Sequence, residues 1–176
     1  MVTFLLGLDN ENYLYKFHLS CMRFFHMLKG VVYLLGEETV KFTNLGLDGE
    51  VLNNIKAQGY EDATEIQALA IPKLLDLETD FIGQAQTGTG KTAAFILPLL
   101  QRLNSRDRKI KALILSPTRE LANQTYGEFQ KLSKGLDLKA EVVFGGSSYD
   151  RQIGGIRKNR PQVIIGTPGR VIDLTE

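Results

Sequence analysis

A glycine-rich run between residues 85 and 92 has the composition of a phosphate-binding loop. It reads Ala85-Gln86-Thr87-Gly88-Thr89-Gly90-Lys91-Thr92 and leads into an apolar stretch patterned as a helix, Ala93 to Leu103. Glycines let backbone N–H groups converge on phosphate oxygens, and the following helix points the positive end of its dipole at the same anion. We predict Lys91 and Thr92 as catalytic residues, with Lys91 at the β and γ phosphates and the Thr92 hydroxyl as a ligand of Mg²⁺. The strict pattern has glycine at Ala85, so the match depends on Gly90-Lys91-Thr92 and its context.

A nucleoside triphosphate site normally also contains an acidic residue at the end of a neighbouring strand, where it holds the magnesium ion. The later apolar runs end in Ser116, Gly145 and Gly166, and no aspartate follows them in the required place. Asp173 follows only the short run Val171-Ile172, in what looks like the start of a helix. We therefore expect the acidic magnesium partner to be absent from this chain.

Four short apolar runs have the length of buried strands and are followed by glycine or proline turns: Phe81–Ile82, Ala112–Leu115, Val142–Phe144 and Val163–Ile165. Helix-patterned stretches precede or separate them, at about residues 48–58, from Thr64 onward, and from Leu121 to Leu132. This alternation predicts an α/β fold with a parallel sheet and helices on both faces. Ligands of such sheets bind beyond the carboxyl ends of the strands, where the turns lie.

A second motif precedes the loop, at Gly59-Tyr60-Glu61-Asp62-Ala63-Thr64-Glu65-Ile66-Gln67. By itself, Thr64 to Gln67 is typical of a capping box, in which the Thr64 hydroxyl and the Gln67 amide satisfy free N–H groups at a helix start. Three further motifs each follow a predicted strand: Pro117-Thr118-Arg119-Glu120-Leu121, Gly145-Gly146 and Thr167-Pro168-Gly169-Arg170. Taken singly, Pro168-Gly169 is an ordinary turn pair and Arg119 is equally compatible with a solvated first-turn residue.

The order of these motifs, with Phe42 upstream, resembles the first RecA-like domain of DEAD-box ATP-dependent RNA helicases, over about residues 40 to 176. The resemblance implies a P-loop fold that is incomplete at the C-terminus, because the chain stops before the acidic motif that names the family. It also implies that Gln67 reads the adenine edge of ATP and that Phe42 packs near the base. A side-chain amide both donates and accepts hydrogen bonds, which suits adenine. Ala63 stands where the family usually has proline, and we expect a looser turn there.

The same resemblance implies a set of site residues. The ATP site would comprise Phe42, Tyr60, Thr64, Gln67, Ala85, Gln86, Thr87, Gly88, Thr89, Gly90, Lys91 and Thr92. The RNA site would comprise Pro117, Thr118, Arg119, Gly145, Gly146, Thr167, Pro168, Gly169 and Arg170. These would contact the sugar-phosphate backbone of single-stranded RNA without reading its sequence. A net charge of +1 agrees, because it excludes binding of a polyanion by bulk electrostatics alone.

Members of this family use two such domains, and arginines of the second domain reach the γ-phosphate. We therefore expect a second RecA-like domain as a partner and expect this chain alone neither to hydrolyse ATP nor to unwind duplexes at a useful rate. Two alternatives stay open: a non-catalytic nucleotide- or RNA-binding fragment, and a different P-loop NTPase such as a kinase or transporter ATPase.

Residues 1–36 form an extension to the domain of residues 37–176 and differ from it in composition. Leu14, Phe17 and Cys21 begin a helical spacing that predicts an amphipathic helix, with a poorly ordered extension as the alternative. His18, Cys21 and His26 match no familiar zinc spacing. Neither a membrane span nor a secretory signal is indicated, and a single cysteine fits a reducing compartment, so we expect a cytoplasmic protein that contacts no membrane.

Overall fold

Three parallel strands form the main sheet. The computed structural model describes residues 39–47, 49–76, 81–103 and 106–175. Strand β5 (Val163–Gly166) lies between β3 (Ala112–Leu115) and β4 (Ala140–Val143). Leu115 and Val143 are both paired with Gly166, so the carboxyl ends of all three strands meet at one edge. Every residue of β5 is buried, as expected for a continuous apolar strand at the centre of a parallel sheet.

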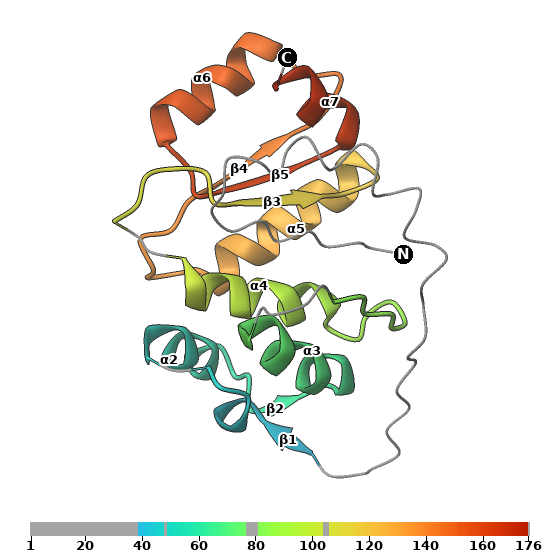
Figure 1. The fold of residues 1–176 in the computed structure, drawn as a ribbon, viewed down its shortest axis with the longest axis vertical. Helices are drawn as coiled ribbons and strands as arrows, with labels where there is room; N and C mark the ends of the chain where they lie inside the picture. The colour runs from blue at the N-terminus through green and yellow to red at the C-terminus, as the bar shows by residue number, and fades with distance from the viewer. Residues whose placement is uncertain (1–38, 48, 77–80, 104–105, 176) are drawn as a thin grey trace.

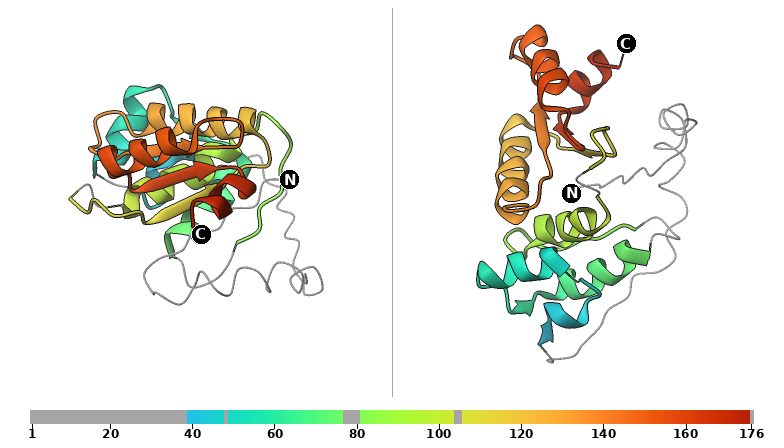
Figure 2. Two further views of the ribbon diagram at one scale, coloured as in Figure 1. Left: turned by 90° about the horizontal axis from the view of Figure 1, so that it is seen from above. Right: turned by 90° about the vertical axis from the view of Figure 1, so that its left-hand side faces the viewer.

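Helices connect and cover these strands. They are α5 (Arg119–Leu132) between β3 and β4, α6 (Tyr149–Asn159) between β4 and β5, and α7 (Pro168–Asp173) after β5. Figure 2 shows α5 and α7 on opposite sides of the strands. The predicted α/β fold, with a parallel sheet and helices on both faces, is confirmed.

Helix α4 (Lys91–Arg102) lies in the interior, between α3 (Glu65–Asp76) and α5 (Figure 1). Its residues 93–100 are all buried, including Phe95 and Leu97. A helix that is apolar on every side is stable only when other elements surround it. The phosphate loop therefore leads into one of the most firmly packed elements of the protein.

The N-terminal part of the described chain is a small antiparallel ribbon followed by helices. Strand β1 (Val40–Lys41) pairs with β2 (Asp62–Ala63), and between them lie the 3-10 helix η3 (Phe42–Asn44) and helix α2 (Gly49–Ala57). Ala63 is paired with Val40 in this ribbon. Ala63 therefore lies in a short strand, and the looser turn that we expect from alanine in place of proline stays a prediction.

Three predicted features differ from the structure. Phe81–Ile82 is not a strand, because residues 81–86 have no regular secondary structure and Ile82 is 57% exposed. Two apolar residues before Gly83 form too short a run, and a strand needs a hydrogen-bonded neighbour to be stable. Asp173 ends α7 instead of lying at a helix start. The third strand begins and ends slightly earlier than predicted, at Ala140 and Val143.

Candidate functional site

The phosphate loop, residues 85–92, closes tightly before α4. Gly88 and Gly90 have φ angles of 82° and 81°, in the left-handed region that glycine adopts without steric cost. The first hydrogen bond inside α4 runs from the Ala94 N–H to the Gly90 carbonyl at 3.1 Å. The N–H groups before Ala94, in the first turn of α4, make no bond within the helix and point toward the loop. This is the arrangement that binds anions at helix N-termini.

The ammonium group of Lys91 lies against the loop itself. Its Nζ donates to the carbonyl oxygens of Ala85 and Gln86, each at 2.5 Å. The Thr89 hydroxyl donates to the same Gln86 carbonyl at 2.8 Å. The loop thus holds a positive charge at its centre, where a phosphate group would complete the set of charges.

Gln67 joins the upstream motif to the phosphate loop. Only 4% of Gln67 is exposed, its Oε1 accepts from the Thr64 N–H at 2.9 Å, and its Nε2 donates to the Gly90 carbonyl at 3.1 Å. The Gln67 half of the capping box is therefore confirmed. The Thr64 hydroxyl instead donates to the carbonyl of Thr89 at 2.8 Å. The side chains of Thr64 and Gln67 are therefore both bonded to the loop.

Phe42 and Tyr60 lie apart from the phosphate loop in their contacts. Phe42 is 1% exposed and its ring meets the Tyr60 ring edge-on, with centroids 5.9 Å apart. Its ring is covered in this structure, so Phe42 supports the segment around Tyr60 from the core. The Tyr60 hydroxyl donates to Glu128 at 3.1 Å and accepts from Lys131 at 3.2 Å. This second hydrogen bond, together with the nearby Glu128 carboxylate, raises the pKa of Lys131.

The other predicted residues gather at the carboxyl ends of the three strands. We call residues 117–119, 144–147 and 167–170 the strand-end surface. Backbone bonds align its parts, because the Ser116 N–H donates to the Gly166 carbonyl at 2.9 Å and the Thr167 N–H to the Val143 carbonyl at 3.0 Å. The Thr118 hydroxyl caps α5 by accepting from the Leu121 N–H at 3.2 Å.

The two arginines of the strand-end surface have different surroundings. Arg119 is exposed, donates to the Gly145 carbonyl at 2.7 Å, and has its guanidinium carbon 4.8 Å from the centre of the Phe144 ring. Gly146 has a φ of 80° and lies so close to the Arg119 side chain that a Cβ there would collide with it. Arg119 is therefore fixed in place while its outer edge stays open to solvent.

Arg170 is turned inward. Its side chain is 11% exposed, and both terminal nitrogens donate to the Ser147 carbonyl at 3.1 Å. One of them also donates to the Gln152 Oε1 at 3.0 Å, and Nε lies 3.5 Å from an Asp173 carboxylate oxygen. The contact with the RNA backbone that the family resemblance implies for Arg170 stays a prediction. Sequence reasoning missed Gln152, because a glutamine in the first turns of a helix has no distinguishing pattern.

The residues that the structure describes contain no cluster of side chains that could hold a metal ion by themselves. Thr92 lies half-buried in the first turn of α4, and no cluster of three His, Cys, Asp or Glu side chains is present within 39–47, 49–76, 81–103 and 106–175. Asp173 lies beside Arg170 of the strand-end surface. His18, Cys21 and His26, like the rest of the extension, lie outside the described residues.

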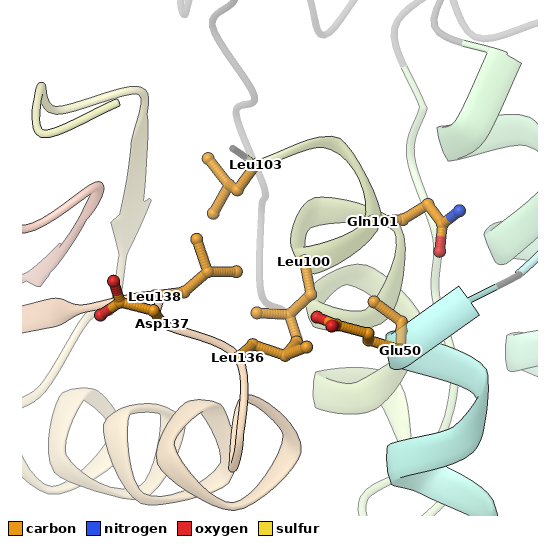
Figure 3. Close-up of a pocket in the computed structure, with 8 residues that line it drawn as sticks. Glu50, Leu100, Gln101, Leu103, Leu136, Asp137 and Leu138 are labelled. Carbon is orange, nitrogen blue, oxygen red and sulfur yellow. The ribbon is translucent and has the colours of Figure 1, made fainter. Parts of the chain in front are cut away.

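One pocket of about 210 Å³ lies at the far end of α4 from the phosphate loop. Leucines make up half of its lining residues, and Glu50 and Asp137 are among the others (Figure 3). Asp137 is already paired with Arg108 at 2.5 Å. None of the predicted site residues lines this pocket. In the described part of the chain, no helix combines the length and the apolar character needed to span a bilayer.

Comparison with known proteins identifies relatives of this arrangement. A family model described as DEAD/DEAH box helicase matches residues 64–176. The ATP-dependent RNA helicase CshA of Limosilactobacillus reuteri is 49% identical over 134 residues, which cover 76% of this chain and 27% of that protein. CshA of Listeria monocytogenes is 48% identical, with 76% and 25% covered. The chain thus spans about a quarter of the length of these curated relatives.

Solved structures agree with the family match. A DEAD box protein from the hyperthermophile Methanococcus jannaschii superposes with a TM-score of 0.70 at 39% identity, covering 76% of this chain and 36% of that one. Mss116p, solved with single-stranded RNA and AMP-PNP, gives a TM-score of 0.73 at 34% identity, covering 78% and 30%.

Proposed function

This chain belongs to the DEAD/DEAH box helicase family, and on that premise we propose that it supplies the ATP-binding surface and part of the RNA-binding surface of an ATP-dependent RNA helicase. The observation that carries the proposal is the direct bonding of Gln67 to Gly90, because it joins the adenine-side motif to the phosphate loop as one unit. A P-loop protein of another kind needs the loop but has no need of this bond. That alternative is accordingly not favoured.

The residues of the phosphate loop fit a triphosphate. Lys91 carries the positive charge, and the free N–H groups at the start of α4 add donors aimed at the same place. The Lys91 ammonium would exchange its two carbonyl partners for phosphate oxygens, which bind it more strongly because they are charged. The Thr92 hydroxyl would hold a magnesium ion, which would supply positive charge to offset that of the phosphates.

The bonds to Thr64 and Gly90 use half of the hydrogen-bonding capacity of the Gln67 amide. One N–H and one lone pair remain for adenine. Gln67 would therefore read the base while it stays bonded to the phosphate loop. Tyr60 and Phe42 are proposed as supports of this segment, through α5 and the core.

RNA is proposed to bind the strand-end surface. Mss116p, one of the similar structures, is bound to single-stranded RNA, and our chain presents an exposed arginine, Arg119, beside exposed glycine backbone at Gly145 and Gly146. Thr118, Thr167 and Gly169 lie in the adjoining turns. Hydroxyls, backbone amides and one guanidinium suit phosphate and ribose contacts, which position a strand without reading its bases.

Hydrolysis is proposed to need a second RecA-like domain. Phosphoryl transfer in P-loop NTPases depends strongly on an arginine that reaches the γ-phosphate and on an acidic magnesium ligand. Among the described residues, neither occurs at the phosphate loop. The 176-residue chain is thus proposed to bind nucleotide and RNA but to turn over ATP negligibly.

Replacing Lys91 by alanine tests the nucleotide site. Lys91→Ala should abolish ADP binding in isothermal titration calorimetry while circular dichroism and the thermal midpoint stay close to those of the unmodified chain, because the lysine bonds only to loop carbonyls. Lys73→Ala, an exposed change in α3, is the matched control and should bind ADP normally. Unchanged ADP affinity in Lys91→Ala would contradict the assignment, and RNA-stimulated turnover by the unmodified chain would contradict the need for a second domain.

A further inference from the structure

We propose that Gln152 is a positioning residue of the RNA-binding surface, and that its partner Arg170 acts as an internal brace for the loop after β4 instead of as a phosphate ligand. The inference rests on the proposed RNA-binding function of the strand-end surface. Gln152 and Arg170 are 18 positions apart in the chain and come from different helices, α6 and α7. They meet beneath the loop that carries Gly145 and Gly146.

Gln152 uses both ends of its amide to hold separate parts of this surface. Its Nε2 donates to the Phe144 carbonyl at 3.0 Å, and its Oε1 accepts from Arg170 at 3.0 Å. The first bond fixes the backbone at the exit of β4, and the second fixes α7. A single half-buried side chain therefore ties two of the three segments of the strand-end surface together.

Arg170 completes the brace from the other side. Both of its terminal nitrogens converge on the Ser147 carbonyl, so the guanidinium closes the loop from Phe144 to Ser147 against α7. Tyr149 lies over the same group, with its ring centre 6.0 Å from the guanidinium carbon, and Asp173 lies 3.5 Å from Nε. With 11% of its side chain exposed, Arg170 has little surface for a strand of RNA.

The braced segment holds the groups that are proposed to touch RNA. Phe144 lies under the Arg119 guanidinium, and the Gly145 carbonyl accepts the hydrogen bond that orients it. Arg119 is thus aimed by a loop that Gln152 and Arg170 hold in place. Loosening that loop should cost RNA affinity by widening the positions that Arg119 and the Gly145-Gly146 backbone sample, without removing any charge that faces the phosphates.

Salt dependence separates a brace from a ligand. Removing one phosphate contact from a protein that binds single strands makes the slope of log affinity against log salt shallower by roughly 0.7. Arg119→Gln should lower the slope by about that amount when a labelled oligouridine RNA is titrated at several salt concentrations. Arg170→Gln should weaken binding with the slope unchanged. A slope reduced equally by Arg170→Gln would overturn the brace, because it would place that guanidinium on a phosphate.

Gln152→Met tests the positioning role directly, because methionine has nearly the same shape and neither polar group. We expect RNA affinity to fall roughly five- to ten-fold, the size of effect that losing one ordinary hydrogen bond produces, again with the slope unchanged. Gln152→Glu keeps an acceptor for Arg170 but cannot donate to the Phe144 carbonyl, and should give an intermediate loss. Gln130→Met, the same change on α5 where the side chain bonds only Tyr126, is the control. Unaltered affinity in Gln152→Met would overturn the inference.

A readout in the absence of RNA distinguishes failure of the inference from failure of the proposed function. Nuclear magnetic resonance of the free chain should show the Arg170 guanidinium protons as slowly exchanging, and Gln152→Met should abolish that signature. Rapid exchange in the unmodified chain would contradict the brace whether or not RNA binds. No RNA binding by the unmodified chain, with slow exchange intact, would contradict the proposed function and refute the RNA-positioning role while leaving the brace itself established.

Discussion

The phosphate loop and the strand-end surface are held in place by different kinds of interaction. In the phosphate loop, Lys91 and Thr89 bond to carbonyls a few residues away, and Thr64 and Gln67 supply the contacts from the upstream motif. In the strand-end surface, each segment is aligned by a neighbouring strand or by a side chain more than 20 positions distant. The loop is mainly a local structure, whereas the surface exists only once the sheet has formed.

This difference predicts how each region fails. A local structure is disturbed by changing its own residues, whereas a surface built by sheet register is disturbed by changing a buried position that supports all of its segments. Gly166 is such a position, because it lies between the last residues of β3 and β4 and immediately before Thr167. We therefore expect the largest loss of stability from a substitution at Gly166, although this residue contacts neither of the proposed ligands, ATP and RNA.

Gly166→Ala should destabilise the protein by about 2 kcal/mol, a typical cost of overpacking a filled interior. An added Cβ would lie 2.8 Å from the backbone oxygen of Val143 and 2.9 Å from a methyl group of Val171, and the backbone atom cannot move without disturbing the sheet. Urea denaturation measures the change. Gly154→Ala is the control, since nothing lies within 4 Å of a Cβ there. This helix-interior substitution should stabilise slightly, by about 0.5–1 kcal/mol.

RNA affinity in Gly166→Ala should fall more than ADP affinity when both are measured under conditions where the protein remains folded. The added methyl group displaces β4 and α7 relative to β5, and both carry parts of the strand-end surface. Equal losses of the two affinities would show that the regions are not independent, and would remove the basis of the comparison.

Gln67→Leu tests the opposite region and should cost roughly 1 kcal/mol of stability, because it leaves the part-buried Thr64 N–H and Gly90 carbonyl without their partner. ADP affinity should fall with it, and RNA affinity should change little. Gln67→Glu retains the acceptor for Thr64 but not the donor to Gly90, so it isolates the bond to the loop. An RNA affinity reduced as strongly as the ADP affinity would show that the two regions are coupled, and would contradict their independence.

The same difference explains what could be predicted from the sequence. The phosphate loop, the Gln67 contact at the start of α3, and the turns after β3, β4 and β5 are encoded within short stretches, so their residue types alone indicated them. The inward turn of Arg170 could not be predicted, because its partners Ser147 and Gln152 are brought to it by the sheet.

Burial set the other limits of prediction. The covered ring of Phe42 and the absence of a strand at Phe81–Ile82 both depend on which elements pack or pair there. A pattern of apolar residues indicates that a segment will be buried, but not which neighbour will bury it. The positions of the loops were accordingly easier to predict than the surroundings of the side chains within them.

The C-terminal end of helix α5 provides the test with the smallest expected effect. The first residue of α5 is Arg119, at the strand-end surface, while the carbonyls of Lys131 and Leu132 at its other end accept hydrogen bonds from Gln58 and Asn54, in and just after α2. The Tyr60 hydroxyl raises the pKa of Lys131 by accepting a hydrogen bond from its ammonium group, and Glu128 adds to the shift.

A lysine whose pKa is higher in the folded state than in the unfolded chain stabilises the fold fully below its unfolded pKa of about 10.5, and this contribution disappears as the pH rises through the folded value. The difference in stability between the unmodified chain and Lys131→Met should thus be constant up to about pH 9.5 and shrink toward higher pH. Its size should be less than about 1 kcal/mol, because the pair is largely exposed and water screens it. Urea denaturation across this range, with Lys134→Met as the control from the next exposed position, measures it. A difference that grows with pH would mean that Lys131 is held by another interaction. The contact of Tyr60 with α5 would then not depend on the Lys131 charge.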